Sequence, residues 1–139
     1  MPDAPRALLD VNVILDVMQQ RRPFYDDSAA VLAAAEAGRL SGLVAAHSVT
    51  TLFYLLSKYG SSDQARVHTV DLLTVMEVAP VDRHVIDDAL ALPYADLEDA
   101  VQMAAARRAG AGYLVTRDRT GYAAGPLPAL TPAELLALL

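Results

Sequence analysis

Residues 7–20 read ALLDVNVILDVMQQ, and this stretch decides the fold class of the chain. The apolar run at 7–11, interrupted only by Asp10, is typical of a buried strand. The next apolar side chains recur at helical spacing and predict a helix over 12–20: Val13, Ile14, Val17 and Met18. A buried strand that passes directly into a helix is the repeating unit of α/β proteins with a parallel sheet.

The alternation of strands and helices continues along the rest of the chain. It predicts strands at 42–46, 77–81 and 112–116, and helices at 28–38, 48–60, 61–76, 82–92 and 96–108. We expect Ser48 and Ser61 to cap the helices they open, and a capping box at 131–134 to open a short final helix. This order predicts a three-layer α/β/α sandwich with a mainly parallel central sheet, formed by residues 1–139 as a single domain.

The composition excludes several classes of protein. The chain has 139 residues, of which 54% are hydrophobic, and it contains no cysteine, so a disulfide framework, a thiolate metal site and a cysteine nucleophile are all excluded. A net charge of −6 disfavours general binding of phosphate backbones unless bound cations or a local basic rim mediate it. No run reaches the ~18 apolar residues of a membrane helix, and no signal sequence opens the chain. We therefore expect a cytoplasmic protein with no membrane partner.

Acidic residues gather where the chemistry of a parallel sheet is expected. Asp10 ends the first predicted strand, and Asp118 lies just past the last one. The helix that leads into that last strand opens with Asp96, Glu98 and Asp99. Reactions in parallel α/β folds take place outside the carboxyl ends of the strands. Clustered carboxylates repel one another and suit Mg²⁺ or Mn²⁺, which indicates metal-assisted hydrolysis of phosphodiester bonds.

A structural interpretation of each of these residues stays open. Asp96 is a suitable N-cap, and the helix dipole favours an acid such as Asp99 in a first turn. Asp118 fits a turn, while Asp16 fits either the same site or a solvated helix face. His47 lies near a strand end, but a single histidine is more often structural.

Three segments resemble the motifs of PIN-domain nucleases, in order and in spacing. They are residues 8–16 (LLDVNVILD), 96–106 (DLEDAVQMAAA) and 114–119 (LVTRDR). Residues 21–25 (RRPFY), after the first helix, are similar to the branch of this family close to the VapC-type toxins. The resemblance covers nearly the whole chain. It implies a PIN-domain fold that cleaves RNA with Mg²⁺ or Mn²⁺.

The resemblance also implies roles for individual residues. The acids that it assigns to the metal site are Asp10, Asp99 and Asp118 as catalytic ligands, with Glu98 and Asp96 as further ligands or supporting groups. Asn12 would orient Asp10 or a water molecule, and Thr116 would hold the last loop. The attacking group would be metal-bound water, so no covalent nucleophile is required.

The chain departs from the family pattern at two positions. An acid usually opens the helix after the second strand, but residues 48–52 read SVTTL, and Thr51 occupies the expected position. A second acid, often found three residues after the position of Asp118, is replaced by Gly121. A hydroxyl is a weaker ligand than a carboxylate. These departures imply that a second metal site is weakened or lost.

The resemblance extends to partners. Arginines near the predicted site would hold the RNA backbone, namely Arg21, Arg22, Arg117 and Arg119. The toxin branch implies an antitoxin that inserts a peptide into the acidic cleft, and we expect a homodimer. The alternative function is a catalytically weakened PIN-fold module that binds RNA or protein. A receiver domain and a haloacid-dehalogenase-type phosphatase are disfavoured, because the only lysine, Lys58, lies within a predicted helix.

Overall fold

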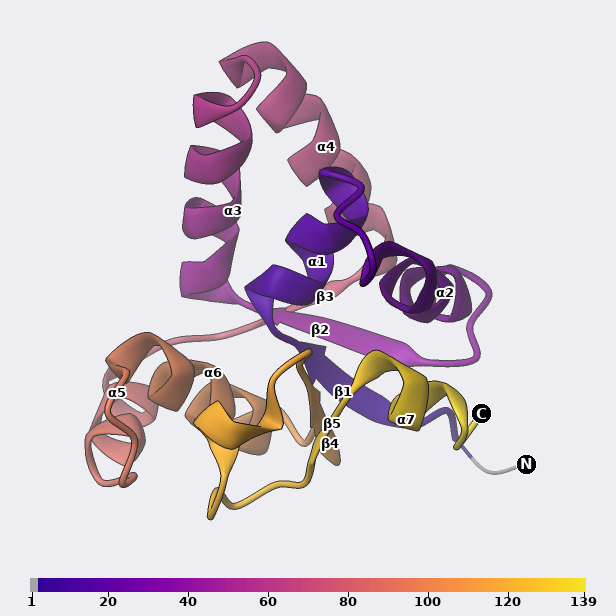
Figure 1. The fold of residues 1–139 in the computed structure, drawn as a ribbon. Coiled ribbons are helices and arrows are strands. Elements are labelled where there is room, and N and C mark those ends of the chain that lie inside the picture. The colour runs from indigo at the N-terminus through magenta and orange to yellow at the C-terminus, as the bar shows by residue number, and fades with distance from the viewer. Residues whose placement is uncertain (1–2) are drawn as a thin grey trace.

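The computed structural model describes residues 3–139, which form a five-stranded parallel sheet between two layers of helices (Figure 1). The strand order is β3-β2-β1-β4-β5. In chain order the strands are β1 (Arg6–Leu9), β2 (Ser41–Ala45), β3 (Glu77–Ala79), β4 (Tyr113–Val115) and β5 (Ala129–Leu130). Ala7 of β1 lies opposite Gly42 of β2 on one side and Tyr113 of β4 on the other. The first strand of the chain is therefore the central strand of the sheet.

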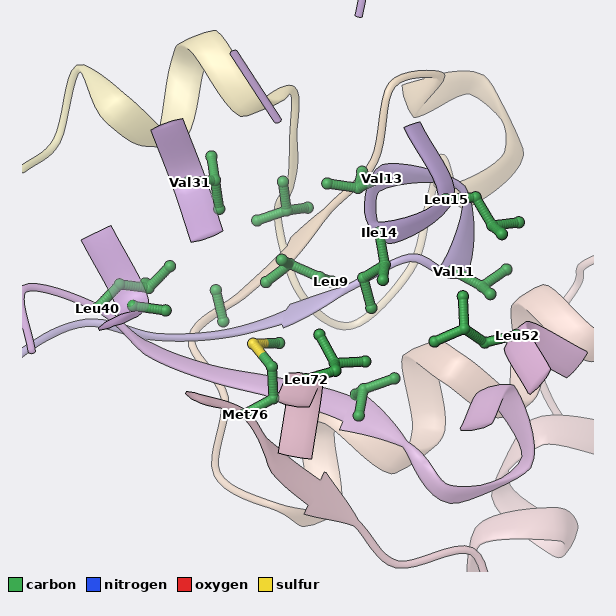
Figure 2. Packing of buried hydrophobic residues seen from close by; sticks show 14 of the residues in the cluster. Leu9, Val11, Val13, Ile14, Leu15, Val31, Leu40, Leu52, Leu72 and Met76 are labelled. Carbon is green, nitrogen blue, oxygen red and sulfur yellow. The ribbon is translucent and has the colours of Figure 1, made fainter. Parts of the chain in front are cut away.

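Two hydrophobic cores cover the two faces of the sheet. Successive strand residues point to opposite faces, so Leu9 packs into one core and Leu8 into the other. The helices over the Leu9 face (Figures 1 and 2) are α1 (Val11–Met18), α2 (Tyr25–Glu36), α3 (Ala46–Lys58), α4 (Ser62–Val75) and α7 (Pro132–Leu136). The helices over the Leu8 face are α5 (Arg83–Leu90) and α6 (Leu97–Arg108). The predicted three-layer α/β/α sandwich is confirmed.

Small side chains let α6 lie close against the sheet. Every residue from Ala100 to Ala106 is buried, and four of these seven are alanines. Gln102 is the polar residue among them, and it is 1% exposed. None of the helices formed by residues 3–139 combines the length and the apolar character needed to cross a lipid bilayer.

The helix termini follow the predicted caps in most places. Ser61 opens α4 by accepting a hydrogen bond from the Gln64 amide, and residues 131–134 form the complete capping box of α7. The prediction for Ser48 was wrong. Helix α3 already begins at Ala46, and Ser48 is buried within it, with its Oγ 3.5 Å from Gln102 Oε1.

Other boundaries differ where the sequence signal is weak. The helix expected from residue 28 begins at Tyr25, where Asp26 and Asp27 suit a first turn. Two elements were not predicted, β5 and the 3₁₀ turn η1 (Arg119–Tyr122). Both are too short to show a hydrophobic period, and β5 exists because its backbone pairs with β4.

Candidate active site

Asp10 lies at the carboxyl end of the central strand, and its carboxylate is firmly held. Its backbone N–H donates to the Val115 carbonyl of β4 at 2.9 Å, which keeps the residue in the sheet. Its Oδ1 accepts from the Asn12 N–H at 2.9 Å, so that Asp10 is also the N-cap of α1. Its Oδ2 lies 2.7 Å from the Tyr122 hydroxyl and 3.4 Å from Thr116 Oγ1. Asn12 contacts Asp10 through this main-chain N–H, and the role that the resemblance implies for its side chain stays a prediction.

Asp99 reaches the same place from the first turn of α6. Its Oδ1 lies 3.2 Å from the Tyr122 hydroxyl, and its N–H donates to Asp96 Oδ1 at 3.1 Å. Asp96 is thus the N-cap of α6, which confirms the structural interpretation of that residue. Burial raises the pKa of Asp99 to about 6, and the negative charges of Asp96, Asp10 and Glu98 contribute. The site concentrates negative charge that its own residues leave uncompensated.

Tyr122, at the end of η1, joins the two carboxylates. Its side chain is 3% exposed, and its hydroxyl is within hydrogen-bond distance of both Asp10 and Asp99. Burial and the two neighbouring acids raise the pKa of the Tyr122 phenol well above its usual range, so the hydroxyl stays neutral. Gln102 Nε2 donates to this hydroxyl at 3.0 Å.

Neither Tyr122 nor Gln102 was predicted as a site residue. Nothing in the sequence shows what the Tyr122 hydroxyl contacts. Gln102 left a clearer signal, as a single amide among the apolar residues 100–106 of a predicted helix. A long polar side chain in such a position requires a buried partner.

Asp118 is near the pair without joining it. Its Oδ1 accepts from the Thr120 hydroxyl at 2.6 Å and from the Thr120 N–H at 3.1 Å, which caps η1 and lowers the pKa of Asp118. Thr116 Oγ1 accepts from the Asp118 N–H at 3.3 Å, which is compatible with the predicted role of Thr116 in holding the last loop. Within residues 3–139, no three acidic or histidine side chains converge closely enough to surround one ion. The structure brings Asp10 and Asp99 together and leaves the Asp118 carboxylate turned to its own loop.

Thr51 and Gly121 stand at the positions where the resemblance leads one to expect acids. Thr51 Oγ1 lies 3.4 Å from Glu98 Oε1, so the second turn of α3 faces the first turn of α6. A Cβ added at Gly121 would lie 3.4 Å from Asp99 Oδ2. Thr51 therefore borders the neighbouring Glu98, and Gly121 borders the acidic pair. Its oxygen donors suit a hard cation such as Mg²⁺ or Mn²⁺, and such a cation would offset the charge that raises the pKa of Asp99.

A family comparison identifies the fold. The sequence model described as "PIN domain" matches residues 6–120, from β1 into η1. The chain belongs to the PIN domain family. The matched range includes Asp10, Asp99 and Asp118, together with the segments that carried the resemblance.

Individual relatives of this PIN domain are distant but cover most of its length. Ribonuclease VapC1 of Aquifex aeolicus (strain VF5) is 24% identical over 125 residues, which are 86% of each chain. A toxin-antitoxin complex from Klebsiella pneumoniae contains a chain of TM-score 0.70 and 22% identity, matching 91% of this chain and 97% of that one. VapC20 of Mycobacterium tuberculosis, a sarcin-ricin loop cleaving toxin, has a TM-score of 0.62 at 15% identity and matches 78% of this chain and 86% of its own. At these identities the solved structures support the fold alone.

The arginines around the PIN domain site are paired with carboxylates of the same chain. Arg117 donates to Asp16 Oδ1 at 2.9 Å, its guanidinium stacks over the Phe24 ring at 4.5 Å, and Arg21 lies 3.8 Å from the same oxygen. Asp16 is completely buried, so of its two alternatives the solvated helix face is excluded. The two exposed candidates, Arg22 and Arg119, pair on the surface with Asp26 at 2.8 Å and Glu134 at 3.1 Å.

A groove adjoins the Asp118 loop of the PIN domain. It has a volume of about 920 Å³ and follows the segment from Arg117 to Thr131. Backbone from η1 to β5 and several small or proline side chains line it. An extended chain with polar groups could lie there, next to the acidic pair.

Proposed function

We propose that this PIN domain is a metal-dependent endoribonuclease and the toxin of a toxin–antitoxin pair. The observation that carries the proposal is the pair formed by Asp10 and Asp99 at the carboxyl edge of a parallel sheet. Membership of the PIN family and the similarity to ribonuclease VapC1 support the same class of reaction.

Asp10 and Asp99 would hold Mg²⁺ or Mn²⁺, with Asp96, Glu98 and Asp118 as nearby acids that complete or support the ligand set. The bound cation would supply an activated water and stabilise the charge that develops on the phosphate. Asn12, Thr116 and Tyr122 act on the carboxylate of Asp10, since each hydrogen-bonds one of its oxygens. The groove along 117–131 would hold the RNA strand, with Arg119 and Arg22 free to exchange their surface partners for phosphates.

The proposed partners are RNA, an antitoxin and a second copy of the chain. Several proteins with the same fold were solved as toxin–antitoxin complexes, including those from Klebsiella pneumoniae and Rickettsia felis. A cationic side chain from an antitoxin could neutralise the acidic pair in place of a metal ion. Tyr54 and Tyr59 on the α3 helix region are 61% and 69% exposed, and we place the homodimer contact there.

Cleavage of labelled single-stranded RNA tests the activity. The wild type is assayed with Mn²⁺, with Mg²⁺ and with EDTA, beside Asp99→Asn and the control Asp87→Asn. Asp87 is an exposed acid on α5 that pairs with Arg83, so its replacement makes the same charge change far from the site. We expect metal-dependent cleavage by the wild type and by Asp87→Asn, and none by Asp99→Asn.

The same variants test the toxin role. Induced expression of the wild type in bacteria should arrest growth, whereas Asp99→Asn at equal expression should not. Cleavage that is equal in all three proteins would indicate a contaminating nuclease. If the wild type cleaves no RNA with either metal, the proposed activity is contradicted. The alternative function, a module that binds RNA or protein, then becomes the better interpretation.

A further inference from the structure

A chain of hydrogen bonds crosses the interior of the molecule and ends on Asp10. Gln102 Oε1 accepts from the backbone N–H of Val11 at 3.3 Å and from Ser48 Oγ at 3.5 Å. These two donors fix the orientation of the Gln102 amide and direct its Nε2 to the Tyr122 hydroxyl, 3.0 Å away. The hydroxyl in turn lies 2.7 Å from Asp10 Oδ2.

The members of this chain come from four separate elements. Val11 opens α1, Ser48 lies in α3, Gln102 in α6 and Tyr122 in η1. All four are buried, so no water competes for the hydrogen bonds. A buried polar network with every member satisfied fixes one arrangement of its side chains, because any other arrangement leaves a polar group unpaired. Among these four residues, it is therefore Tyr122 whose hydroxyl contacts the acidic pair.

The position of that hydroxyl is what gives it a role. Asp10 and Asp99 are both acids, and the negative charges of Asp96 and Glu98 add to the repulsion at Asp99. Two neighbouring carboxylates disfavour each other's ionised form, and a neutral hydrogen-bond donor beside them lessens that conflict. The Tyr122 hydroxyl fills this place, 2.7 Å from one carboxylate and 3.2 Å from the other.

We propose that Tyr122 is a positioning residue of this site, whose hydroxyl, oriented by Gln102, holds Asp10 and Asp99 side by side for the cation. This inference rests on the proposed function for the identity of the ligand and adds a group outside the acidic set. The residues that hydrogen-bond metal ligands typically change affinity or activity about 10- to 100-fold when they are removed. The aromatic ring of Tyr122 packs in the hydrophobic core, whereas its hydroxyl contacts the two acids.

Tyr122→Phe removes the hydroxyl and keeps the ring. Tyr94→Phe is the matched control, because the Tyr94 hydroxyl donates to the main-chain carbonyl of Tyr122 at 3.1 Å and the two rings pack edge to face at 6.0 Å. Both variants lose one tyrosine hydroxyl from the same cluster, and only one of the lost hydroxyls faces the acids. We compare their thermal unfolding in EDTA, their affinity for Mn²⁺ by calorimetry, and their kcat and KM for RNA.

We expect Tyr122→Phe to fold and to weaken Mn²⁺ binding about 10-fold relative to Tyr94→Phe. Its kcat at subsaturating Mn²⁺ should fall by a similar factor, with KM for RNA unchanged, because the hydroxyl is buried against the carboxylates. Equal Mn²⁺ affinity in the two variants would overturn the inference. If the wild type binds Mn²⁺ but cleaves no RNA, the proposed nuclease activity is contradicted. The comparison of Mn²⁺ affinities still tests the proposed role of Tyr122 in that case. A wild type that does not bind Mn²⁺ would overturn both proposals.

Discussion

Asp99 is the residue at which the conflict between folding and function is most direct. Its pKa of about 6 lies above the ordinary value of 3.8, chiefly because the carboxyl is buried and then because Asp96, Asp10 and Glu98 repel its charged form. Between pH 3.8 and about 6 the folded protein therefore binds more protons than the unfolded chain. Stability falls as the pH rises through this range and stays reduced above it. In the metal-free protein, ionisation of Asp99 therefore lowers the free energy of unfolding.

The first prediction follows from this sign. In EDTA at pH 8, Asp99→Asn should raise the free energy of unfolding by about 1 kcal/mol, allowing for screening of a partly exposed group by water. The difference should shrink as the pH falls below 6 and vanish below pH 3.8, where Asp99 is neutral in both the folded and the unfolded wild type. Urea unfolding at a series of pH values measures it. If Asp99→Asn is less stable than the wild type at pH 8, the ionised Asp99 does not destabilise the metal-free protein.

A second prediction separates two arginines that the sequence presents as equivalent. Arg117 and Arg119 both flank Asp118, but Arg117 neutralises the fully buried Asp16 and Arg119 makes a surface pair with Glu134. Arg117→Ala should lower the free energy of unfolding by about 2 to 3 kcal/mol, because it leaves the buried Asp16 with only the longer contact to Arg21 at 3.8 Å. Arg119→Ala should change it by less than about 1 kcal/mol. Chemical denaturation of both variants checks the contrast, and equal values would remove the structural role of Arg117.

Among the secondary-structure elements, helix α7 has the clearest start signals in its own sequence. Thr131 and Glu134 form a reciprocal capping box, and Pro132 stands at the first helical position. The helix has five residues and covers the sheet with Leu135, which is completely buried. A helix this short depends on its cap and on its packing for stability.

The third prediction is that Thr131→Ala destabilises the protein by about 1 kcal/mol. The matched control is Thr74→Ala in the exposed part of α4, where the hydroxyl only bonds the carbonyl of Asp71 within its own helix. We expect less than half the effect there, as measured by urea unfolding. If the two threonines cost the same to remove, the capping box contributes nothing specific.

The elements differ in how far their sequence determines them. The strand at Arg6–Leu9 and the start of α6 at Asp96 were predictable, because an apolar run and an N-cap are local signals. β5 was not, since two residues show no period and become a strand only by pairing with β4. The same division applies to the site. Asp10 and Asp99 were predicted from strand ends and a helix start, whereas the buried pairing of Asp16 with Arg117 depends on residues 101 positions apart.

At the scale of the whole molecule, cation binding should be coupled to folding. Asp10 comes from the end of β1 in the sheet and Asp99 from helix α6, and they meet only in the folded chain. A ligand that binds the folded state alone stabilises it by about 2.7 kcal/mol at a concentration 100 times its dissociation constant. A site shared between β1 and α6 therefore stabilises the entire fold.

The fourth prediction is that Mn²⁺ raises the unfolding temperature of the wild type and does so less at pH 5 than at pH 8. The pH dependence arises because protons compete for Asp99, whose pKa is about 6 in the metal-free protein. Thermal unfolding followed by circular dichroism measures both effects, with Asp99→Asn and Asp87→Asn for comparison. An increase that persists in Asp99→Asn would place the bound ion elsewhere.

The central position of β1 has a consequence for the timing of synthesis. Asp10 leaves the ribosome early, but Thr116 lies 106 residues and Tyr122 112 residues further along the chain. One of the two strands beside β1, and two of the groups that fix Asp10, are therefore translated more than 100 residues after it. Until then the nascent polypeptide carries the first acid with no complete site around it. We expect the proposed nuclease to stay inert toward the RNA of the ribosome that makes it until the segment from β4 to Tyr122 has emerged.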